Sequence, residues 1–426
     1  MQSKMTTRFI KRRRTTNLLG WPTDIVSVDP KLDHPRDISV HTILVWVPGN
    51  PGQHDWYHFD FVDVLIGLGR GYAIRSLSHA GHGLVRNSSC GDDYANSIID
   101  VEDHCHQYRV DKDNSASPLI PWTVEGQVLH KIAFVDSLLS SIAGGNRTSE
   151  YKHQDVCPIA PNPRFIFIGH SFGCHVIQRM CILRPDILER TTGFLFLMPY
   201  IRSKPCFVAE RKIMDFVGSY PEYLISIGTK LSRILKFFPE PMVRSLIRKG
   251  LQGDSSGNED GGGDGESTTN VATKLLRDPL YPRTFFELGT EEIRDIPNEI
   301  DITALRLLSL RKPLLFQSTT FKGVRAQLNE TRHRPIFILY ADDNDQWCPS
   351  FHGEEIRTLQ SVNVLPESIE RTKISCLRHD YVCQNQSVRS KVNNWCISKI
   401  IRMNNNVRGI HVKKPSRMTE ILSSKL

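Results

Sequence analysis

The segment from Arg164 to Leu183 constrains this chain most strongly. It reads RFIFIGHSFGCHVIQRMCIL, in which an apolar run meets Gly-His-Ser-Phe-Gly and passes directly into an amphipathic stretch. This order predicts a buried strand, a sharp turn and a helix. Gly169 and Gly173 suit a turn in which a Cβ would collide with neighbouring backbone. The turn would leave the Ser171 hydroxyl exposed at a helix N-terminus, which is typical of a nucleophile elbow.

Other apolar runs predict the rest of a sheet. A bare Gly-x-Ser-x-Gly pattern is weak, and its context of a strand before and a helix after is what gives it weight. Helical patterns separate the runs, so we predict an α/β-hydrolase type of fold, with a mostly parallel central sheet, helices on both faces and a helical cap insertion. The further predicted strands are Thr42–Val47, Tyr72–Leu77, Gly193–Met198 and Pro335–Tyr340.

Composition sets the bounds of this fold. The 426 residues are 39% hydrophobic, enough for one large α/β domain with insertions or for two domains. No run approaches about 18 uncharged apolar residues, and the N-terminus lacks the apolar core of a signal peptide. We therefore expect an intracellular protein that is not secreted. The ten cysteines form no CxxC pairs, which fits buried thiols.

The net charge of +8 is concentrated at the two ends of the chain. Residues 1–23 carry six Lys or Arg and no acid, and residues 401–426 carry six against one glutamate. The body between them is slightly acidic, which argues against a nucleic-acid-binding core. We expect flexible basic tails, which either touch an anionic surface or stay solvated.

The first predicted strand stops abruptly at Pro48-Gly49-Asn50-Pro51-Gly52. Such a loop lies at the carboxyl edge of an open α/β sheet, where these folds build their sites. An oxyanion hole needs one backbone N–H from a loop of this kind and one from the residue after the nucleophile. We predict Asn50 and Phe172 as the two donors, with Gly49 allowing close approach. The alternative is a simple Pro/Gly turn.

Two further groups would complete a catalytic triad. The strand ending at Tyr340 is followed by three aspartates, Asp342, Asp343 and Asp345, each of which could instead cap a turn. A last predicted strand ends near Cys376. His379 follows it and lies C-terminal to both partners. The order Ser, Asp, His matches α/β-hydrolases. His379 would take the Ser171 proton during attack on an ester carbonyl.

Histidine pairs elsewhere invite a metal interpretation. His79 and His82 lie three apart, and His104 and His106 flank Cys105. No further ligand set with zinc-like spacing exists in the sequence. We therefore expect no metal and no cofactor.

The region between residues 201 and 330 is predicted to form the cap. Residues 230–238 and 242–249 have apolar positions at helical spacing, basic residues beside them and Pro-Glu-Pro between them. Such a basic amphipathic pair suits an interfacial lid, or it packs on the body. The candidate lipid-contacting residues are Leu231, Leu235, Phe238, Val243, Leu246 and Ile247.

These observations divide the chain into five parts. The divisions are a basic N-terminal tail (1–40), a first core part (41–200) with a surface insertion (84–121), a helical cap (201–330) with a disordered linker (252–270), a second core part (331–402) and a basic C-terminal tail (403–426).

Five stretches resemble the lipid droplet-associated hydrolase family, in the same order along roughly residues 42–400. The resemblance implies a serine nucleophile and action on neutral lipid esters at droplet surfaces. The family places the triad acid two residues before a tryptophan, here Trp347, which implies Asp345, with Asp343 second and Asp342 third. This chain departs from the pattern in its insertion, its glycine-rich segment and its tails. The stretches are Val47–Gly52, Ser78–His82, Gly126-Gln127 with His130-Lys131, Gly169–Gly173 and Leu288–Glu292.

The expected function is that of a serine esterase or lipase that cleaves a sterol ester or acylglycerol through an acyl-enzyme. A thioesterase or acyltransferase could use the same triad. A non-catalytic droplet or membrane adaptor could keep the fold alone.

The chain ends in Ser424-Lys425-Leu426. A terminal Ser-Lys-Leu is a peroxisomal address read by an import receptor. Peroxisome therefore competes with lipid droplet as the expected location, and the two are compatible if the enzyme acts where these organelles meet.

Overall fold

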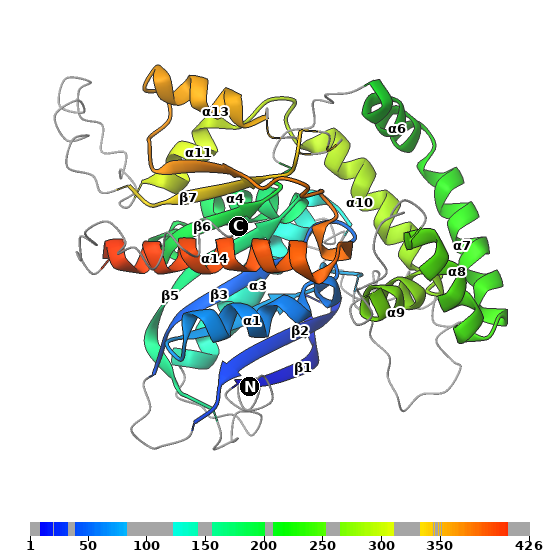
Figure 1. Cartoon of the computed structure of the whole chain (residues 1–426), viewed down its shortest axis with the longest axis horizontal. Coiled ribbons are helices and arrows are strands. Elements are labelled where there is room, and N and C mark those ends of the chain that lie inside the picture. Colours follow the sequence, from blue (N-terminus) through cyan, green and yellow to red (C-terminus); the bar gives the residue numbers. More distant parts are fainter. Residues whose placement is uncertain are drawn as a thin grey trace, which may run out of the picture.

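The computed structural model describes residues 9–19, 21–32, 39–82, 122–143, 156–200, 208–252, 265–310, 333–343, 345, 348, 350 and 352–407. A single eight-stranded sheet, ordered β1-β2-β4-β3-β5-β6-β7-β8, runs through them (Figure 1). The strands from β3 onward are parallel, and β1 and β2 are antiparallel. This topology confirms the expected α/β-hydrolase fold. The strands are β1 (Phe9–Leu18), β2 (Trp21–Pro30), β3 (Val40–Val47), β4 (Tyr72–Leu77), β5 (Ile159–His170), β6 (Thr191–Leu197), β7 (Ile336–Tyr340) and β8 (Ile369–Lys373).

Helices cover both faces of the sheet. Helices α1 (His58–Leu68) and α14 (Gln386–Val407) pack together on one face, and α3 (Val124–Ala143), α4 (Phe172–Leu183) and α11 (Ile302–Ser309) lie on the other (Figure 1). Because both faces are covered, every residue of β6 and β7 is buried, as continuous apolar strands require. Two further helices, α5 (Pro185–Glu189) and α13 (His352–Ser361), complete the layers. Within the described ranges, every helix is too short or too polar to cross a bilayer.

The cap lies between β6 and β7. Five helices form it at one side of the sheet (Figure 1). The expected linker is too long at its C-terminal end, because α9 begins at Gly265 and buries Thr269 and Thr273 on one face. Residues 253–264 and the insertion 84–121 lie outside the described residues. The cap helices are α6 (Val208–Ser219), α7 (Pro221–Phe237), α8 (Glu240–Gln252), α9 (Gly265–Leu276) and α10 (Tyr281–Asp295).

The expected N-terminal tail is wrong for residues 9–18 and 21–30, which form the β1-β2 hairpin at the edge of the sheet. Ile25, Val26 and Val28 are buried beside β4 and supply the apolar contact that holds the hairpin. The basic run 11–14 lies on β1, where charged side chains keep an edge strand from pairing with another chain. At the other end, α14 continues to Val407, so the C-terminal tail does not begin at 403.

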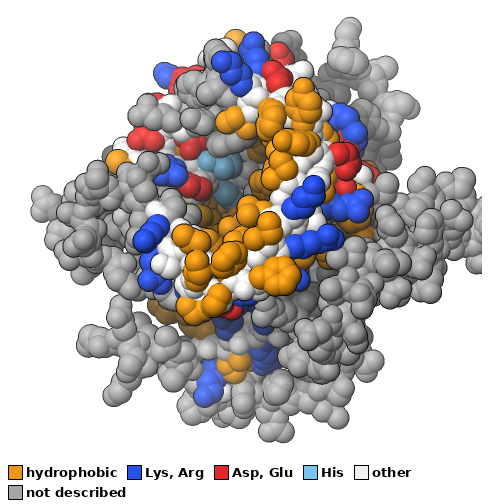
Figure 2. All heavy atoms as spheres, turned by 90° about the vertical axis from the view of Figure 1, so that its right-hand side faces the viewer, with side chains coloured by type: hydrophobic (Ala, Val, Ile, Leu, Met, Phe, Trp, Pro, Cys, Tyr) orange, Lys and Arg blue, Asp and Glu red, His pale blue; other side chains and the backbone are white. Residues whose placement is uncertain are grey.

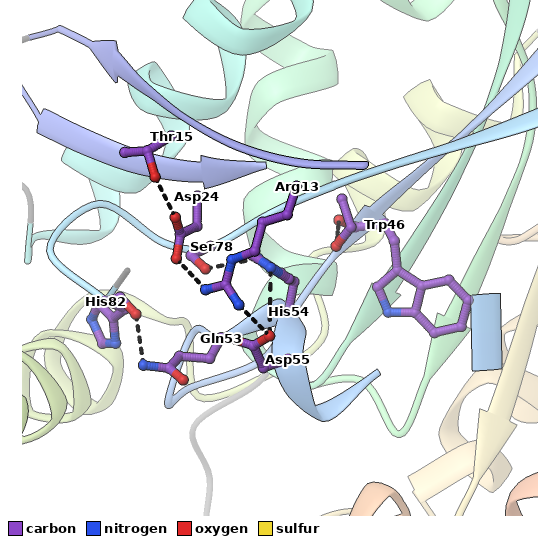
Figure 3. A network of polar contacts seen from close by, with 10 residues as sticks. Arg13, Thr15, Asp24, Trp46, Gln53, His54, Asp55, Ser78 and His82 are labelled. Atoms are coloured by element: carbon purple, nitrogen blue, oxygen red, sulfur yellow. Dashed lines mark hydrogen bonds and ion pairs between the residues drawn. The ribbon is translucent and has the colours of Figure 1, made fainter. Parts of the chain in front are cut away.

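Ion pairs tie the hairpin to the rest of the molecule. The Arg13 guanidinium lies between Asp24 of β2, at 2.5 Å, and Asp55, at 3.0 Å (Figure 3). Asp55 belongs to the 3-10 helix η3 (His54–Trp56), which follows the loop after β3. Arg75 of β4 pairs with Asp29 of β2 at 2.7 Å, and both side chains are almost fully buried. The hairpin is therefore a structural part of the core.

The Arg75–Asp29 pair gives a test of this conclusion. Asp29→Ala should lower the free energy of unfolding by about 3 to 5 kcal/mol, because it leaves the Arg75 guanidinium buried without its counter-ion. Urea unfolding measures the loss. As a control, Asp186→Ala removes an exposed partner of Arg184 and should change the same free energy by less than about 1 kcal/mol. Equal effects of the two substitutions would contradict a structural hairpin.

Candidate active site

The turn between β5 and α4 (residues 169–173, here the serine turn) holds Ser171 in an unusual backbone conformation. Its φ is 50° and its ψ is −123°, in the left-handed half of the map that costs a non-glycine residue about 1 to 3 kcal/mol. A Cβ at Gly173 would lie 2.4 Å from the Val47 carbonyl oxygen, and one at Gly169 would lie 2.9 Å from the Cys174 nitrogen. Both glycines therefore allow the close approach that the sequence predicted.

The loop after β3 lies against the serine turn. A Cβ at Gly49 would lie 2.7 Å from the Cβ of Ser171, so only glycine fits there. The N–H groups of Asn50 and Phe172, predicted as oxyanion donors, make no hydrogen bond within the described ranges. The Asn50 side chain turns to the cap instead and donates its Nδ2 hydrogen to the Phe285 carbonyl at 3.3 Å. Both backbone N–H groups are thus available as donors.

The structure brings His379 to Ser171. The His379 Nε2 lies 2.8 Å from the Ser171 Oγ, although 208 positions separate the two residues. Burial lowers the pKa of His379, and the nearby Asp345 charge raises it by less. The ring is therefore neutral near pH 7, with Nε2 placed to accept the Ser171 hydrogen.

Asp345 holds His379 by its backbone and not by its ring. Its Oδ2 accepts the backbone N–H of His379 at 2.6 Å, and its Oδ1 accepts the N–H of Cys348 at 2.8 Å. The Nδ1 of His379 has no hydrogen-bond partner in the part of the chain that the structure describes. The carboxylate therefore anchors the histidine loop by its backbone and acts on the ring through charge.

The other two aspartates lie away from His379. Asp342 accepts the N–H groups of Asp343 and Cys376, each at 2.8 Å, and so caps the turn after β7. Asp343 forms an ion pair with Lys373 at the surface. Of the three alternatives, Asp345 alone contacts the histidine.

A family model described as lipid-droplet associated hydrolase matches residues 40–382. The chain belongs to this family. The match begins at the first residue of β3, so the β1-β2 hairpin lies outside it.

Relatives in the lipid droplet-associated hydrolase family are distant in sequence. The lipid droplet-associated hydrolase of Gallus gallus is 20% identical over 381 residues, covering 88% of this chain and 92% of the relative. That of Homo sapiens is 22% identical over 348 residues, covering 79% and 81%. Among solved structures, a haloalkane dehalogenase from Agrobacterium tumefaciens is similar with a TM-score of 0.49 and 11% identity, covering 92% of this chain and 97% of that chain.

In this member of the family, two residues that the sequence analysis missed connect the parts of the site. Tyr57 Oη lies 3.2 Å from the Gly49 nitrogen and 2.7 Å from His170 Nδ1, and His170 Nε2 lies 2.9 Å from the His379 carbonyl oxygen. A carbonyl only accepts, so Nε2 carries the hydrogen and Nδ1 accepts from the tyrosine. Burial lowers the pKa of His170 to about 3, which keeps the ring neutral. The position of His170 inside the serine turn was the only signal in the sequence.

The candidate lipid-contacting residues are divided by the structure. Leu231, Phe238 and Leu246 are exposed, and Leu235 and Ile247 are half-buried. Val243 is only 1% exposed, so its assignment to the interface was wrong. Helix α8 packs against α9, and Val243 lies on its buried side.

The address Ser424–Leu426 lies outside the described residues. No group of three or more His, Cys, Asp or Glu that could hold a metal occurs within the described ranges.

The Tyr57 link makes a testable contribution to stability. Tyr57→Phe leaves the Gly49 N–H and the His170 Nδ1 buried without partners, so it should lower the free energy of unfolding by about 1 to 3 kcal/mol. Chemical denaturation measures the change. Tyr223→Phe, at an exposed position of α7, is the matched control and should alter stability by less than about 0.5 kcal/mol. A loss no larger than that of the control would rule out this link.

Proposed function

We propose that this protein is a serine hydrolase that cleaves carboxylic esters of neutral lipids, such as a sterol ester or an acylglycerol. The observation that carries the proposal is the 2.8 Å contact between Ser171 Oγ and His379 Nε2 at the carboxyl edge of the sheet. Membership of the lipid droplet-associated hydrolase family supports the substrate class.

The mechanism uses groups already in position. His379 Nε2 accepts the Ser171 proton as Oγ attacks the ester carbonyl. The free N–H groups of Asn50 and Phe172 stabilise the negative charge on the carbonyl oxygen. The imidazolium returns its proton to the leaving alcohol, which yields an acyl-enzyme. Water activated by the same ring then releases the acid.

Asp345 and the strained serine support these steps. The Asp345 charge favours the imidazolium that forms during attack, and its hydrogen bond to the His379 N–H fixes the loop that carries the ring. The positive φ of Ser171 aims the hydroxyl out of the turn and toward the substrate. Because burial lowers its pKa, His379 stays neutral, and so able to accept a proton, at a lower pH than an ordinary histidine does.

A fluorophosphonate probe tests the proposal directly. We expect wild-type protein to be labelled and Ser171→Ala to lose both labelling and ester turnover, the latter by about 10⁴-fold or more. Ser141→Ala, an exposed serine of α3, is the control and should behave as wild type. A panel of esters of increasing acyl length, with sterol esters and acyl-CoA, identifies the substrate class. Labelling that survives in Ser171→Ala, or no labelling of wild type, would refute the proposal and favour an adaptor.

We also propose that the cap binds a lipid droplet or membrane surface. Hydrophobic side chains form a continuous band over the cap, with lysine and arginine beside it and a hollow next to it (Figure 2). Phe237 is 88% exposed, which is rare for a large apolar residue. Basic side chains beside such a band suit an anionic phospholipid layer. The exposed apolar residues are Ile213, Phe216, Tyr220, Tyr223, Ile227, Leu231, Ile234, Phe237, Phe238, Met242 and Leu246.

Point substitutions are the appropriate test of this surface. A deletion of residues 230–249 would also expose the side of α9 that packs on α8. Leu231→Ser with Phe237→Ser should reduce binding to phospholipid-coated triolein droplets at least about tenfold, since each loses roughly 1 kcal/mol or more of apolar burial. Turnover of a soluble short ester should stay within about twofold. Val362→Ser, an exposed apolar position after α13, is the control. Undiminished flotation with droplets would exclude this binding surface.

Peroxisomal targeting stays a prediction from the terminal Ser-Lys-Leu, with the import receptor as its partner. The names of the relatives support the droplet instead.

A further inference from the structure

One side chain of the loop after β3 (residues 48–52, here the oxyanion loop) is held by the cap. The Asn50 Nδ2 lies 3.3 Å from the Phe285 carbonyl oxygen and 3.7 Å from where a Cβ would stand on Gly289. The Asn50 amide also lies close enough to the Glu292 carboxyl to favour its charged form. Positions 285, 289 and 292 follow helical spacing, so they form one stripe along α10. Asn50 is thus seated on the inner side of a cap helix.

Glu292 is unusual among the acids of this helix. It is only 7% exposed, and no cation pairs with it in the part of the chain that the structure describes. Its neighbours Glu291 and Asp295 both contact Arg294. Burial raises the pKa of Glu292 to about 8, against a smaller opposite effect of Asn50. The carboxyl is therefore mostly protonated at neutral pH.

A protonated carboxyl matches an amide in hydrogen bonding. Asn50 Oδ1 and Glu292 Oε1 are both buried oxygens with no partner in the described ranges. A carboxylate could only accept, and it would leave Asn50 Oδ1 without a donor. A carboxylic acid both donates and accepts, so it can satisfy the amide at both of its ends.

We propose that Glu292 is a positioning residue for the oxyanion loop. Its carboxyl holds Asn50 on α10 and so makes the cap part of the hydrolytic site. The inference rests on the proposed function. Gly49 touches Ser171, so a displacement of Asn50 moves the adjacent N–H away from the reacting carbonyl. The contribution would arise as charge develops on the carbonyl oxygen, and it should therefore affect kcat more than KM.

Helix α10 is well placed for this role because it rests on the body of the protein. Leu288 is fully buried in the main core, and Arg283 lies over the Trp122 ring at 5.6 Å. A Cβ at Gly289 would be in ordinary van der Waals contact with the Asn50 Nδ2, so the amide lies directly against this helix. The stripe that meets Asn50 therefore has a fixed position relative to the sheet.

The experiment compares three variants by kcat and KM on a soluble short ester, by the rate of fluorophosphonate labelling and by thermal unfolding. Glu292→Gln keeps a donor and an acceptor, so kcat should stay within about threefold of wild type. Glu292→Leu should lower kcat by about 10 to 100-fold with KM changed less than about threefold. The control is Glu291→Leu, which alters the adjacent acid of α10. That acid pairs with Arg294, so its loss should leave kcat unchanged.

A double-mutant cycle covers the case in which Glu292→Leu folds poorly. Asn50→Ala keeps the backbone N–H but removes the amide, so it should lower kcat by a similar factor to Glu292→Leu. Because both act through one contact, their combination should cost no more than either alone. Additive losses, an unchanged kcat in Glu292→Leu, or a Glu292→Gln as slow as Glu292→Leu would each overturn the inference while wild type remains active. Wild type without Ser171-dependent labelling would overturn the proposed function as well.

Discussion

The close contact between the serine turn and the end of β3 is the constraint on which the site depends. A Cβ at Gly173 would stand 2.4 Å from the Val47 carbonyl oxygen and 2.5 Å from that of Pro48. Only a glycine there lets α4 start directly beside the oxyanion loop. Gly49 likewise lies against Ser171, which has a positive φ. The two loops therefore form one edge of the site. The histidine loop is joined to it by two hydrogen bonds of the His379 backbone, whose N–H donates to Asp345 and whose carbonyl accepts from His170.

The sequence predicted the parts of this edge that depend on local chemistry. Buried parallel strands read as apolar runs, and glycines mark the serine turn, so β3 to β7 and Ser171 could be found without coordinates. The choice of Asp345 needed the family resemblance, because three aspartates in one loop look alike locally. Its contact with the His379 backbone could not be foreseen, since it depends on how two distant loops meet. The Tyr57–His170 link was missed for the same reason.

The predictions from sequence were wrong where the local composition indicates one environment and the tertiary contacts provide another. The β1-β2 hairpin carries Lys11–Arg14 and looked like a solvated tail, yet Arg13 is neutralised by Asp24 and Asp55. The start of α9 has no aliphatic residue before Val271, yet Thr269 is buried and the helix packs on α8. Helical spacing in α8 identified an apolar face, but such a face can contact either a lipid surface or a neighbouring helix. The packing of α8 on α9 decided that Val243 is core.

The cap contacts explain how one helix layer can serve both the proposed surface and the proposed chemistry. A Cβ at Gly228 of α7 would lie 2.6 Å from the Pro282 side chain, so α7 and α10 are in close contact at this point. Helix α7 carries five of the exposed apolar residues, and α10 carries the buried Glu292. Tight packing transmits displacement because interiors have few voids to absorb it. A lipid layer that holds α7 would therefore also hold α10, and with it Asn50 beside Ser171.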